Sequence, residues 1–411
     1  MLAVCDRDSL RSVEQAIAAL QARITQLPRS EIISLKHAAG RVLREPITAS
    51  LNVPAWDNSA MDGYAFNFAQ AQAAGFSLPV SGRIIAGDTE AHELLAHTAV
   101  RIFTGAPLPA GADTVAAQED CQLDEQQRVT LPEQKQGQHV RYQAEELKIG
   151  QPVLAQGTML RAQEIGLLAS LGYSEVQVYR PLRVGLISSG NELRELGESL
   201  EPGQIYDVNR YSIGSLLEGW GFDLQCYGIM PDHVQASAHI LAEAAAENDV
   251  LISTAGVSVG EEDHLKAAIE QLGELHLWRV AIQPGKPLAF GEVRDTPWVG
   301  LPGNPAAAFV TALIIARPFL RQAQGVTTEE VLGMQLPADF SSTKQRPRRQ
   351  YLRAKLQLKQ NASWVSVHPN QGSAMLTAAS WADGLALVEA NSQVHERDLV
   401  TFIPFSQLVA L

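Results

Sequence analysis

Cysteine is scarce in this 411-residue chain, and its few copies are not arranged for metal or redox chemistry. The three cysteines, Cys5, Cys121 and Cys226, are odd in number and lie far apart along the chain. This pattern contains no zinc or redox spacing, and it is typical of a protein that stays in a reducing compartment. We therefore expect a cytoplasmic protein.

Positive charge is also in short supply. The chain has 32 Lys and Arg residues against 45 Asp and Glu residues, which leaves a formal net charge of −13. Because nucleic acid is bound through a broad basic face, this balance excludes nucleic acid as the expected partner. A small anion is not excluded, since a local site is enough to hold it.

Long apolar runs are missing from the sequence. The most apolar stretch, residues 306–316, is interrupted by Thr311 and falls short of the ~20 residues that a membrane-spanning helix requires. Charge enters at Asp6, before an apolar signal segment could form, so we expect neither a signal peptide nor a membrane partner. Hydrophobic residues still make up 46% of the chain, which predicts a folded protein of roughly two to four domains.

Residues 181–327 alternate between strand-like and helix-like patterns. Asn209 is expected to cap one of the helices, and a long apolar helix is expected to begin at Pro305. An amphipathic helix is predicted earlier, at 8–26. The alternation predicts a doubly wound parallel sheet with helices on both faces. Its predicted strands are 183–188, 222–230, 250–253 and 298–301.

The other two stretches are predicted to be rich in β-structure. Residues 28–180 contain short apolar runs broken by glycine and proline, which is typical of short strands and turns, with one helix at 162–171. Residues 328–411 lack a long helical pattern and predict a small β domain, open or barrel-like. Its predicted strands are 350–358, 364–367, 385–388 and 399–402.

Acidic side chains follow several strands of the predicted parallel sheet. In such a sheet ligands bind outside the carboxyl ends of the strands, where the loops meet. The loops here bring Glu192, Asp232 and Asp263 toward one crevice beside glycine-rich backbone. Carboxylates and bare amides suit a divalent cation and a phosphate or oxyanion. The alternative is that these carboxylates are solvated loop residues.

Two of these loops could hold an anion directly. Pro302, Gly303 and Asn304 precede Pro305, which at the first position of a helix leaves the preceding amides free to point at an anion. The second loop offers Gly256, Ser258 and Gly260, which could bind phosphate through a hydroxyl and backbone amides.

A serine hydrolase is a rival hypothesis. The GVSVG segment at 256–260 follows a predicted strand and matches the nucleophile pattern G-x-S-x-G, with Ser258 as nucleophile. No glycine-rich oxyanion segment precedes it, and the residues after Ser258 are poor helix starters. The remaining triad members would be Asp263 or Asp295 with His276 or His368.

One basic run, from Lys344 to Arg349, is expected to be a solvated strand edge.

Five short motifs occur in an order that resembles the MoeA-type molybdopterin molybdenumtransferases, whose animal relative is gephyrin. The resemblance covers nearly the whole chain, and the ordered set is far more specific than any one motif. The motifs are NSAMDGY at 58–64, TGAP at 104–107, GVSVG at 256–260 with Asp263, PGKP at 284–287 and PGNP at 302–305.

The resemblance implies an elongated homodimer with four domains in each chain. The α/β domain, 1–27 plus 181–327, would be similar to the molybdopterin adenylyltransferases, and a linking domain would comprise 28–49 plus 150–180. A β-rich domain at 50–149 would carry the NSAMDGY motif, and 328–411 would form the C-terminal β domain. The active site would lie between the α/β domain of one subunit and the β-rich domain of the other.

The resemblance also implies a reaction. Molybdate would be inserted into adenylylated molybdopterin with release of AMP and the molybdenum cofactor, and a molybdopterin adenylyltransferase is an expected partner. Mg²⁺ would be held by Glu192, Asp232 and Asp263, and it would offset pyrophosphate charge. Molybdate suits the Pro302–Pro305 turn. The residues that match the family's functional positions are Asp62, Thr104, Glu192, Asp232, Asp263, Lys286, Pro302 and Pro305.

The sequence departs from the family pattern at a few positions. Asn191 stands where an aspartate is common, and Gln283 stands where a lysine commonly precedes Pro-Gly-Lys. Ala255 replaces a glycine, and 144–146 reads Ala-Glu-Glu in place of Gly-Glu-Asp. We expect Gln283 to weaken anion binding. A catalytically weakened, gephyrin-like scaffold therefore stays open as an alternative.

Overall fold

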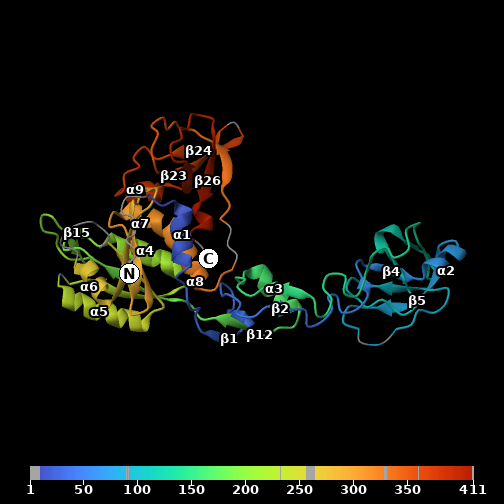
Figure 1. The fold of residues 1–411 in the computed structure, drawn as a ribbon. Helices are drawn as coiled ribbons and strands as arrows, with labels where there is room; N and C mark the ends of the chain where they lie inside the picture. Colours follow the sequence, from blue (N-terminus) through green and yellow to red (C-terminus); the bar gives the residue numbers. More distant parts are fainter. Residues whose placement is uncertain are drawn as a thin grey trace.

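The computed structural model describes residues 10–88, 90, 92–231, 233–255, 264–327, 331–359 and 361–409. Figure 1 shows an elongated molecule: an α/β body lies beneath a β-rich C-terminal region, and a second β-rich body lies at the far end of a slender connection. The chain passes through the connection to this distal body and returns before it completes the α/β body. Figure 1 shows this path, since blue and green segments lie side by side in the connection.

A six-stranded sheet of order β16-β13-β17-β21-β20-β18 forms the centre of the α/β body. Its first four strands are parallel, which confirms the predicted α/β class. The last two are antiparallel and were not expected, because β20 and β21 form a hairpin through Arg294 and Asp295, both at positive φ as in a type I′ turn. The strands are β13 (Arg183–Ser188), β16 (Asp223–Ile229), β17 (Val250–Thr254), β18 (Gly273–Arg279), β20 (Pro287–Val293) and β21 (Thr296–Leu301).

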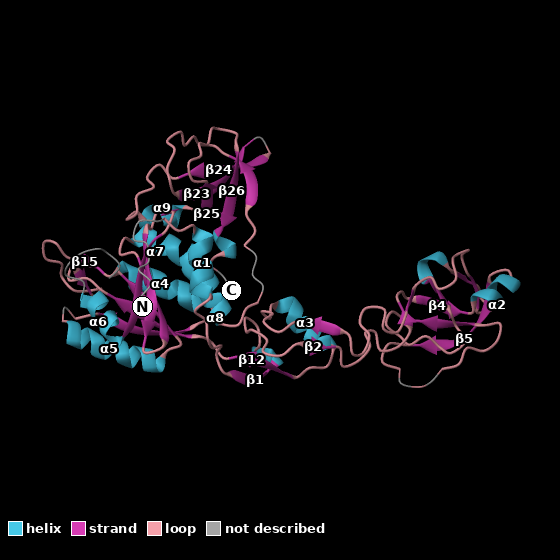
Figure 2. Ribbon diagram, in the orientation of Figure 1, coloured by secondary structure: helices cyan, strands magenta, loops and turns pink. Residues whose placement is uncertain are grey.

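Helices cover both faces of this sheet (Figure 2). One face packs against α1 (Val13–Gln21), α4 (Val208–Gly219) and a continuous helical segment over 305–323. The other face packs against α5 (Val234–Glu247) and α6 (His264–Leu272). The segment over 305–323 comprises α7 (Pro305–Thr311), a π-helical turn η3 (Ala312–Ala316) and α8 (Arg317–Ala323). Its length and composition would allow a membrane span, but 83% of its 18-residue window is buried, as in a core helix.

Two details of the helices differ from the sequence-based expectation. Helix α1 is shorter than the predicted 8–26: Ser12 and Gln15 close a capping box at its start, and Ala22 is its C-cap. Asp207, not Asn209, caps α4 by accepting a hydrogen bond from the backbone N of Arg210 at 3.2 Å. Asn209 is buried instead and donates to the backbone oxygen of Gly303 at 2.7 Å, so it ties α4 to the loop after β21.

The linking region has a small core of its own. Strand β1 (Ser30–Ser34) pairs with β12 (Glu175–Tyr179), β2 (Ile47–Thr48) pairs with β11 (Pro152–Leu154), and both pairs are antiparallel. Helix α3 (Ala162–Ser170) packs against them, at the position predicted for a helix. Each pair joins a segment that precedes the distal body in the sequence to a segment that follows it. The distal body is therefore connected to the rest of the chain by two segments.

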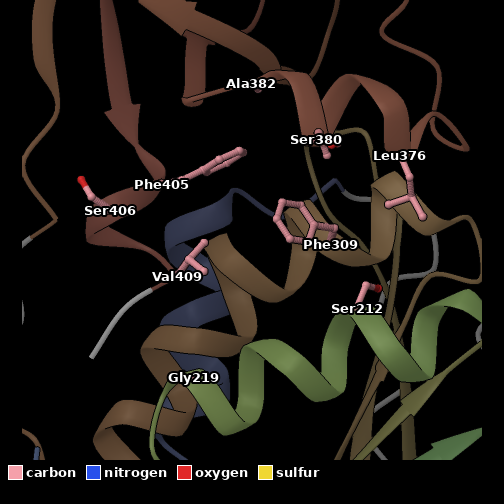
Figure 3. Close-up of a pocket in the computed structure, with 10 residues that line it drawn as sticks. Ser212, Gly219, Phe309, Leu376, Ser380, Ala382, Phe405, Ser406 and Val409 are labelled. Atoms are coloured by element: carbon pink, nitrogen blue, oxygen red, sulfur yellow. The ribbon is translucent and has the colours of Figure 1, made fainter.

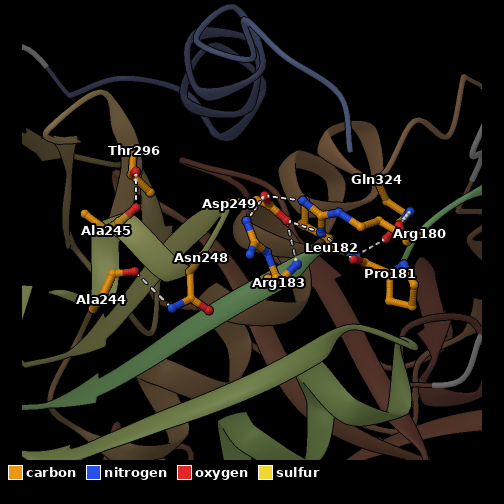
Figure 4. A network of polar contacts seen from close by, with 10 residues as sticks. All are labelled: Arg180, Pro181, Leu182, Arg183, Ala244, Ala245, Asn248, Asp249, Thr296 and Gln324. Carbon is orange, nitrogen blue, oxygen red and sulfur yellow. Dashed lines mark hydrogen bonds and ion pairs between the residues drawn. The ribbon is translucent and has the colours of Figure 1, made fainter. Parts of the chain in front are cut away.

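A polar network fastens the linking region to the α/β body (Figure 4). Two guanidinium nitrogens of Arg180, just after β12, lie 2.7 Å from the two carboxylate oxygens of Asp249, just before β17. Arg183 adds its backbone N at 2.8 Å and a guanidinium nitrogen at 3.2 Å. Gln324, after α8, bonds to the backbone of both Arg180 and Leu182. The junction is therefore held by charge-assisted bonds.

The distal body is a β-sheet of order β7-β4-β6-β5-β9-β8. All strand pairings in this sheet are antiparallel except that of β5 with β6. The body also contains a short helix, α2 (Phe68–Ala73), which the sequence did not predict. Apolar residues of alternate position fill two small cores on the two faces of the sheet. The strands are β4 (Gly63–Phe66), β5 (Ser77–Ile84), β6 (Ala99–Ile102), β7 (Thr114–Ala117), β8 (Gln122–Leu123) and β9 (Arg128–Thr130), with β3 (Asn58–Ser59) and β10 (Val140–Arg141) paired beside them.

The C-terminal region is a β domain, as predicted. Its sheet has the order β19-β23-β25-β26-β22, and β24 pairs with β23. The first of these strands belongs to the α/β region of the sequence, so this pairing joins the two regions. A short helix, α9 (Leu376–Trp381), was not foreseen. The strands are β19 (Ile282–Gln283), β22 (Met334–Pro337), β23 (Arg349–Lys359), β24 (Ala362–Val367), β25 (Gly384–Val388) and β26 (Leu399–Pro404).

Candidate active site

The carboxyl ends of three parallel strands meet at one edge of the α/β sheet. Ser188 stands in register with Thr254, and Thr254 with Leu301, so the loops that follow begin side by side. The backbone nitrogen of Ala255 donates to the oxygen of Leu301 at 3.1 Å, and that of Ser189 donates to Thr254 at 3.2 Å. This edge is where ligands of open α/β sheets bind.

Glu192 lies exposed in the loop after β13. Its backbone oxygen accepts from the nitrogen of Ile205 at 2.8 Å, and the next residues form β14 (Leu193–Arg194), which pairs with β15 (Ile205–Tyr206). A Cβ on Gly190 would lie 2.6 Å from a carboxylate oxygen of Glu192. The glycine therefore leaves room for the carboxylate to lie over the loop backbone.

The Pro302–Pro305 loop packs against its neighbours at the same edge. Asn304 precedes α7 without a side-chain capping bond, and Pro305 occupies the first turn, as predicted. A Cβ on Gly303 would lie 3.2 Å from that of Ala255, which shows how closely the loops after β21 and β17 approach. A larger residue at 303 would push the two loops apart.

The Pro-Gly-Lys turn approaches this loop through Gly285, the residue before Lys286. The side chain of Lys286 is exposed between β19 and β20. Gly285 has a φ of 105°, and a Cβ there would lie 2.4 Å from Oγ1 of Thr311 and 3.7 Å from Cγ of Pro302. Only glycine permits this approach. The structure thus places the Pro-Gly-Lys turn directly against Pro302 and α7.

Five predicted site residues lie outside the described residues. They are Asp232, Gly256, Ser258, Gly260 and Asp263. Their flanking residues are described: Pro231 follows β16, Ala255 follows β17 and His264 begins α6. Within the described ranges, no group of three or more His, Cys, Asp or Glu side chains could hold a metal ion.

Asp62 and Thr104 form a second cluster, in the distal body. The backbone nitrogen and the hydroxyl of Thr104 donate to one carboxylate oxygen of Asp62, at 2.9 and 2.7 Å. These two bonds lower the pKa of the Asp62 carboxyl below its usual value, because they stabilise the charged form. Within one chain, β4 and its neighbours lie far from the α/β sheet (Figure 1). One chain alone therefore does not bring Asp62 and Thr104 to Glu192, Lys286 and the Pro302–Pro305 loop.

A buried arginine that was not predicted from the sequence lies close to the Pro-Gly-Lys turn. Arg353 lies in β23 with no exposed surface, and its guanidinium donates, among the described residues, to the backbone oxygens of Tyr351 at 3.4 Å and Gly372 at 3.1 Å. Within the described residues no carboxylate neutralises it, and burial lowers its pKa to about 10. The sequence did contain a sign of this burial: Arg353 lies within the predicted strand 350–358, between the apolar residues Leu352 and Ala354.

Arg353 backs a cavity of about 500 Å³ between the C-terminal sheet and the Gln283–Pro284 bond. Arg346 also lines this cavity, so this residue of the basic run is not simply part of a solvated strand edge. Arg349, from the same run, forms ion pairs with Glu14 and Glu389. A buried cation without a carboxylate partner, next to an open cavity, suits a small anion.

A second cavity is lined mainly by apolar side chains. Figure 3 shows Phe309, Leu376, Phe405 and Val409 around an open groove between α4, α7, α9 and the C-terminal turn. Its volume is about 800 Å³, and none of the described residues that line it is charged. None of the predicted site residues is among its lining residues, so it does not suit an anionic substrate.

The proposed hydrolase triad is not supported. Asp295 lies in the turn before β21, at the opposite end of that strand from the edge where the loop after β17 begins. His276 stacks on Phe290 with ring centroids 4.8 Å apart, and His368 bonds to the backbone of Asn370 in the C-terminal domain. Neither histidine is at the edge that would present Ser258.

Comparison with known proteins agrees with this architecture. Residues 11–172 match the family described as MoeA N-terminal region (domain I and II), 185–322 match Probable molybdopterin binding domain, and 335–405 match MoeA C-terminal region (domain IV).

Curated relatives and solved structures point the same way. A molybdopterin molybdenumtransferase of Haemophilus influenzae is 41% identical over 306 residues, which cover 74% of this chain and 76% of the relative. One of Nostoc sp. is 36% identical over 326 residues, covering 77% and 75%. The solved structure of the molybdopterin biosynthesis moeA protein from Pyrococcus horikoshii OT3 is 25% identical, with a TM-score of 0.80 over 96% of this chain and 100% of that one. The chain therefore belongs to the MoeA family.

Proposed function

We propose that this protein is a molybdopterin molybdenumtransferase that inserts molybdate into adenylylated molybdopterin and releases AMP and the molybdenum cofactor. Relatives of that name cover about three quarters of the chain and support the assignment. An enzyme that carries out adenylyl transfer onto molybdopterin would supply the substrate. The cytoplasm is the compartment we propose, in keeping with three cysteines that are odd in number and lie far apart along the chain.

The proposed site needs two copies of the chain. Asp62 and Thr104 lie in a body that is separate from the sheet edge with Glu192 and Lys286 (Figure 1). A homodimer in which the distal body of one subunit covers the sheet edge of the other would complete the site. The separation within one chain is the observation that supports this arrangement.

Molybdate has a suitable place at the junction of the α/β and C-terminal domains. The Pro-Gly-Lys turn packs on Pro302 through Gly285, and Arg353 lies behind Gln283 and Pro284. We propose that molybdate binds between Lys286, Arg353 and the Pro302–Pro305 loop. A dianion there would gain from one buried and one exposed cation and from the amides before α7.

Mg²⁺ would be held by Glu192 together with Asp232 and Asp263, which lie outside the described residues. Carboxylate oxygens are the donors that this hard cation prefers. When bound, Mg²⁺ would offset the charge of the phosphoanhydride and so assist release of AMP. Glu192 would orient the ion, and Gly190 leaves space for that carboxylate.

The test is release of AMP from adenylylated molybdopterin by the purified full-length protein. We expect release to require molybdate and to fall when Mg²⁺ is chelated. A Lys286→Met variant should lose turnover, whereas Lys36→Met, at an exposed position of the linking region, should retain it. No AMP release in the presence of molybdate and Mg²⁺ would overturn the proposed function.

A further inference from the structure

Two arginines stand side by side on one face of the distal sheet. Arg83 in β5 is in parallel register with Arg101 in β6, and the next pair, Ile84 and Ile102, is buried on the opposite face. Like charges that face each other on neighbouring strands destabilise a sheet. The fold therefore keeps a pair that costs stability, at the end of β6 that leads into Thr104.

Aromatic rings hold the two guanidinium groups in place. The guanidinium carbon of Arg83 lies 4.7 Å from the ring centroid of Phe103, and that of Arg101 lies 4.8 Å from it. Arg101 also lies 5.2 Å from the ring of Tyr64. Cation–π contacts of this kind offset part of the repulsion and fix the side chains on the sheet.

The two arginines differ in what neutralises them. Arg101 donates to Gln118 and to the backbone oxygen of Gly63, and its charge acts on the carboxylates of Asp62 and Glu119. Arg83 is exposed, and in the described part of the chain its contact is the Phe103 ring, with no hydrogen bond or ion pair. Arg83 is thus a positioned cation whose donor groups are free for a ligand.

We propose that Arg83 binds a phosphoryl oxygen of the adenylylated substrate, beside the Asp62–Thr104 pair. This inference rests on the proposed function, in which molybdate occupies the other side of the site and the phosphoanhydride is the remaining anion. A guanidinium group offers two parallel N–H donors that match two oxygens of one phosphate. The chain has a net charge of −13, so an anionic substrate is attracted only where a local cation such as Arg83 offsets this charge.

The test compares Arg83→Gln with Arg128→Gln in the full-length protein. Arg128 is an exposed arginine in β9 of the same body, and its guanidinium bonds to the backbone oxygen of Ser77 at 2.8 Å. We expect Arg83→Gln to raise the KM for adenylylated molybdopterin about tenfold, as for loss of a hydrogen bond to a charged group. The KM for molybdate should stay unchanged, and the effect should shrink at high salt.

Phe103→Leu is a second variant, because it keeps the charge of Arg83 and removes the ring beneath it. We expect a smaller rise of the same KM. Inorganic pyrophosphate provides a probe that needs no turnover: calorimetry should show that Arg83→Gln binds it more weakly than wild type and Arg128→Gln do.

Equal KM values and equal pyrophosphate affinities for Arg83→Gln and Arg128→Gln would overturn the assignment. A change confined to the KM for molybdate would also overturn it, because the bound anion would then be molybdate. If the wild-type protein releases no AMP, the proposed function fails, and the pyrophosphate comparison still decides whether Arg83 binds phosphate.

Discussion

Thr104 donates both its backbone N–H and its hydroxyl to the same carboxylate oxygen of Asp62, across 42 residues of sequence. Thr104 is exposed and Asp62 is half-buried, so the pair contributes little to the core and is open to a ligand. The two bonds keep the carboxylate charged and fixed in direction. This is what a residue that orients a substrate or a proton requires.

Replacement of Thr104 by Val should raise the pKa of Asp62 toward its ordinary value. The hydroxyl bond is lost while the backbone bond remains, so the shift should be partial. The acid limb of the activity profile should move to higher pH in the same direction. Titration of the Asp62 carboxyl carbon by NMR measures the effect. Thr98→Val, which removes a hydroxyl bonded to Ser81 in the same body, is the control. An Asp62 pKa equal to that of wild type would refute the role of the hydroxyl.

Mixing Asp62→Asn chains with Asp263→Asn chains should restore activity. If each site takes Asp62 from one subunit and Asp263 from the other, a heterodimer contains one site free of both substitutions. Tagged heterodimers should therefore regain about half of the wild-type rate, although each homodimer is inactive. Activity no higher than that of the homodimers would show that each site lies within one chain.

Gln283→Lys should strengthen binding of the anionic substrate. Gln283 lines the cavity with Arg346 and Arg353, so a lysine there adds a cation close to two others. The attraction should be roughly 1 kcal/mol at a partly exposed position. The apparent constant for molybdate should fall at low salt, and the gain should shrink as salt is added. Gln283→Met controls for packing. A constant that stays the same or rises at low salt would rule out the idea.

Arg353→Met should separate function from stability. Removing a buried cation that lacks a carboxylate partner removes a desolvation cost, so the melting temperature should stay the same or rise. Turnover should fall sharply if Arg353 holds molybdate. Arg349→Met, which breaks the ion pairs with Glu14 and Glu389, is the matched control and should lower stability slightly. A destabilised Arg353→Met enzyme with normal turnover would mean that Arg353 is structural.

Asp249→Asn should weaken the junction between the linking region and the α/β body. Burial raises the pKa of Asp249, but hydrogen bonds from Arg180 and Arg183 outweigh it and bring the pKa below its ordinary value. Because the folded-state pKa is depressed, this stabilisation is present above the unfolded value of about 3.9 and is lost as pH falls through the folded value. At pH 7 we expect a loss of about 1–3 kcal/mol. Denaturant unfolding at pH 7 and pH 3 measures it, and an equal gap between wild type and variant at both pH values would contradict the linkage.

The alternation of strand and helix patterns over 181–327 was enough to predict a parallel sheet and the edge where its loops gather. The periodicity of apolar residues carries this information locally, and parallel strands bring their carboxyl ends together whatever the register. Glu192, Pro302 and Pro305 were predicted at that edge for this reason. Lys286 and the distal residues came from the family motifs alone.

Contacts between segments far apart in sequence were decided only by the tertiary structure. The Asp62–Thr104 pair, the Arg83–Arg101 register and the burial of Arg353 depend on which strands pair and in what register. Asp207, not Asn209, caps helix α4, and the Asn209 side chain instead donates a hydrogen bond to Gly303 in the loop after β21. A side chain's partner follows from the packing of the whole chain, and local pattern does not record it.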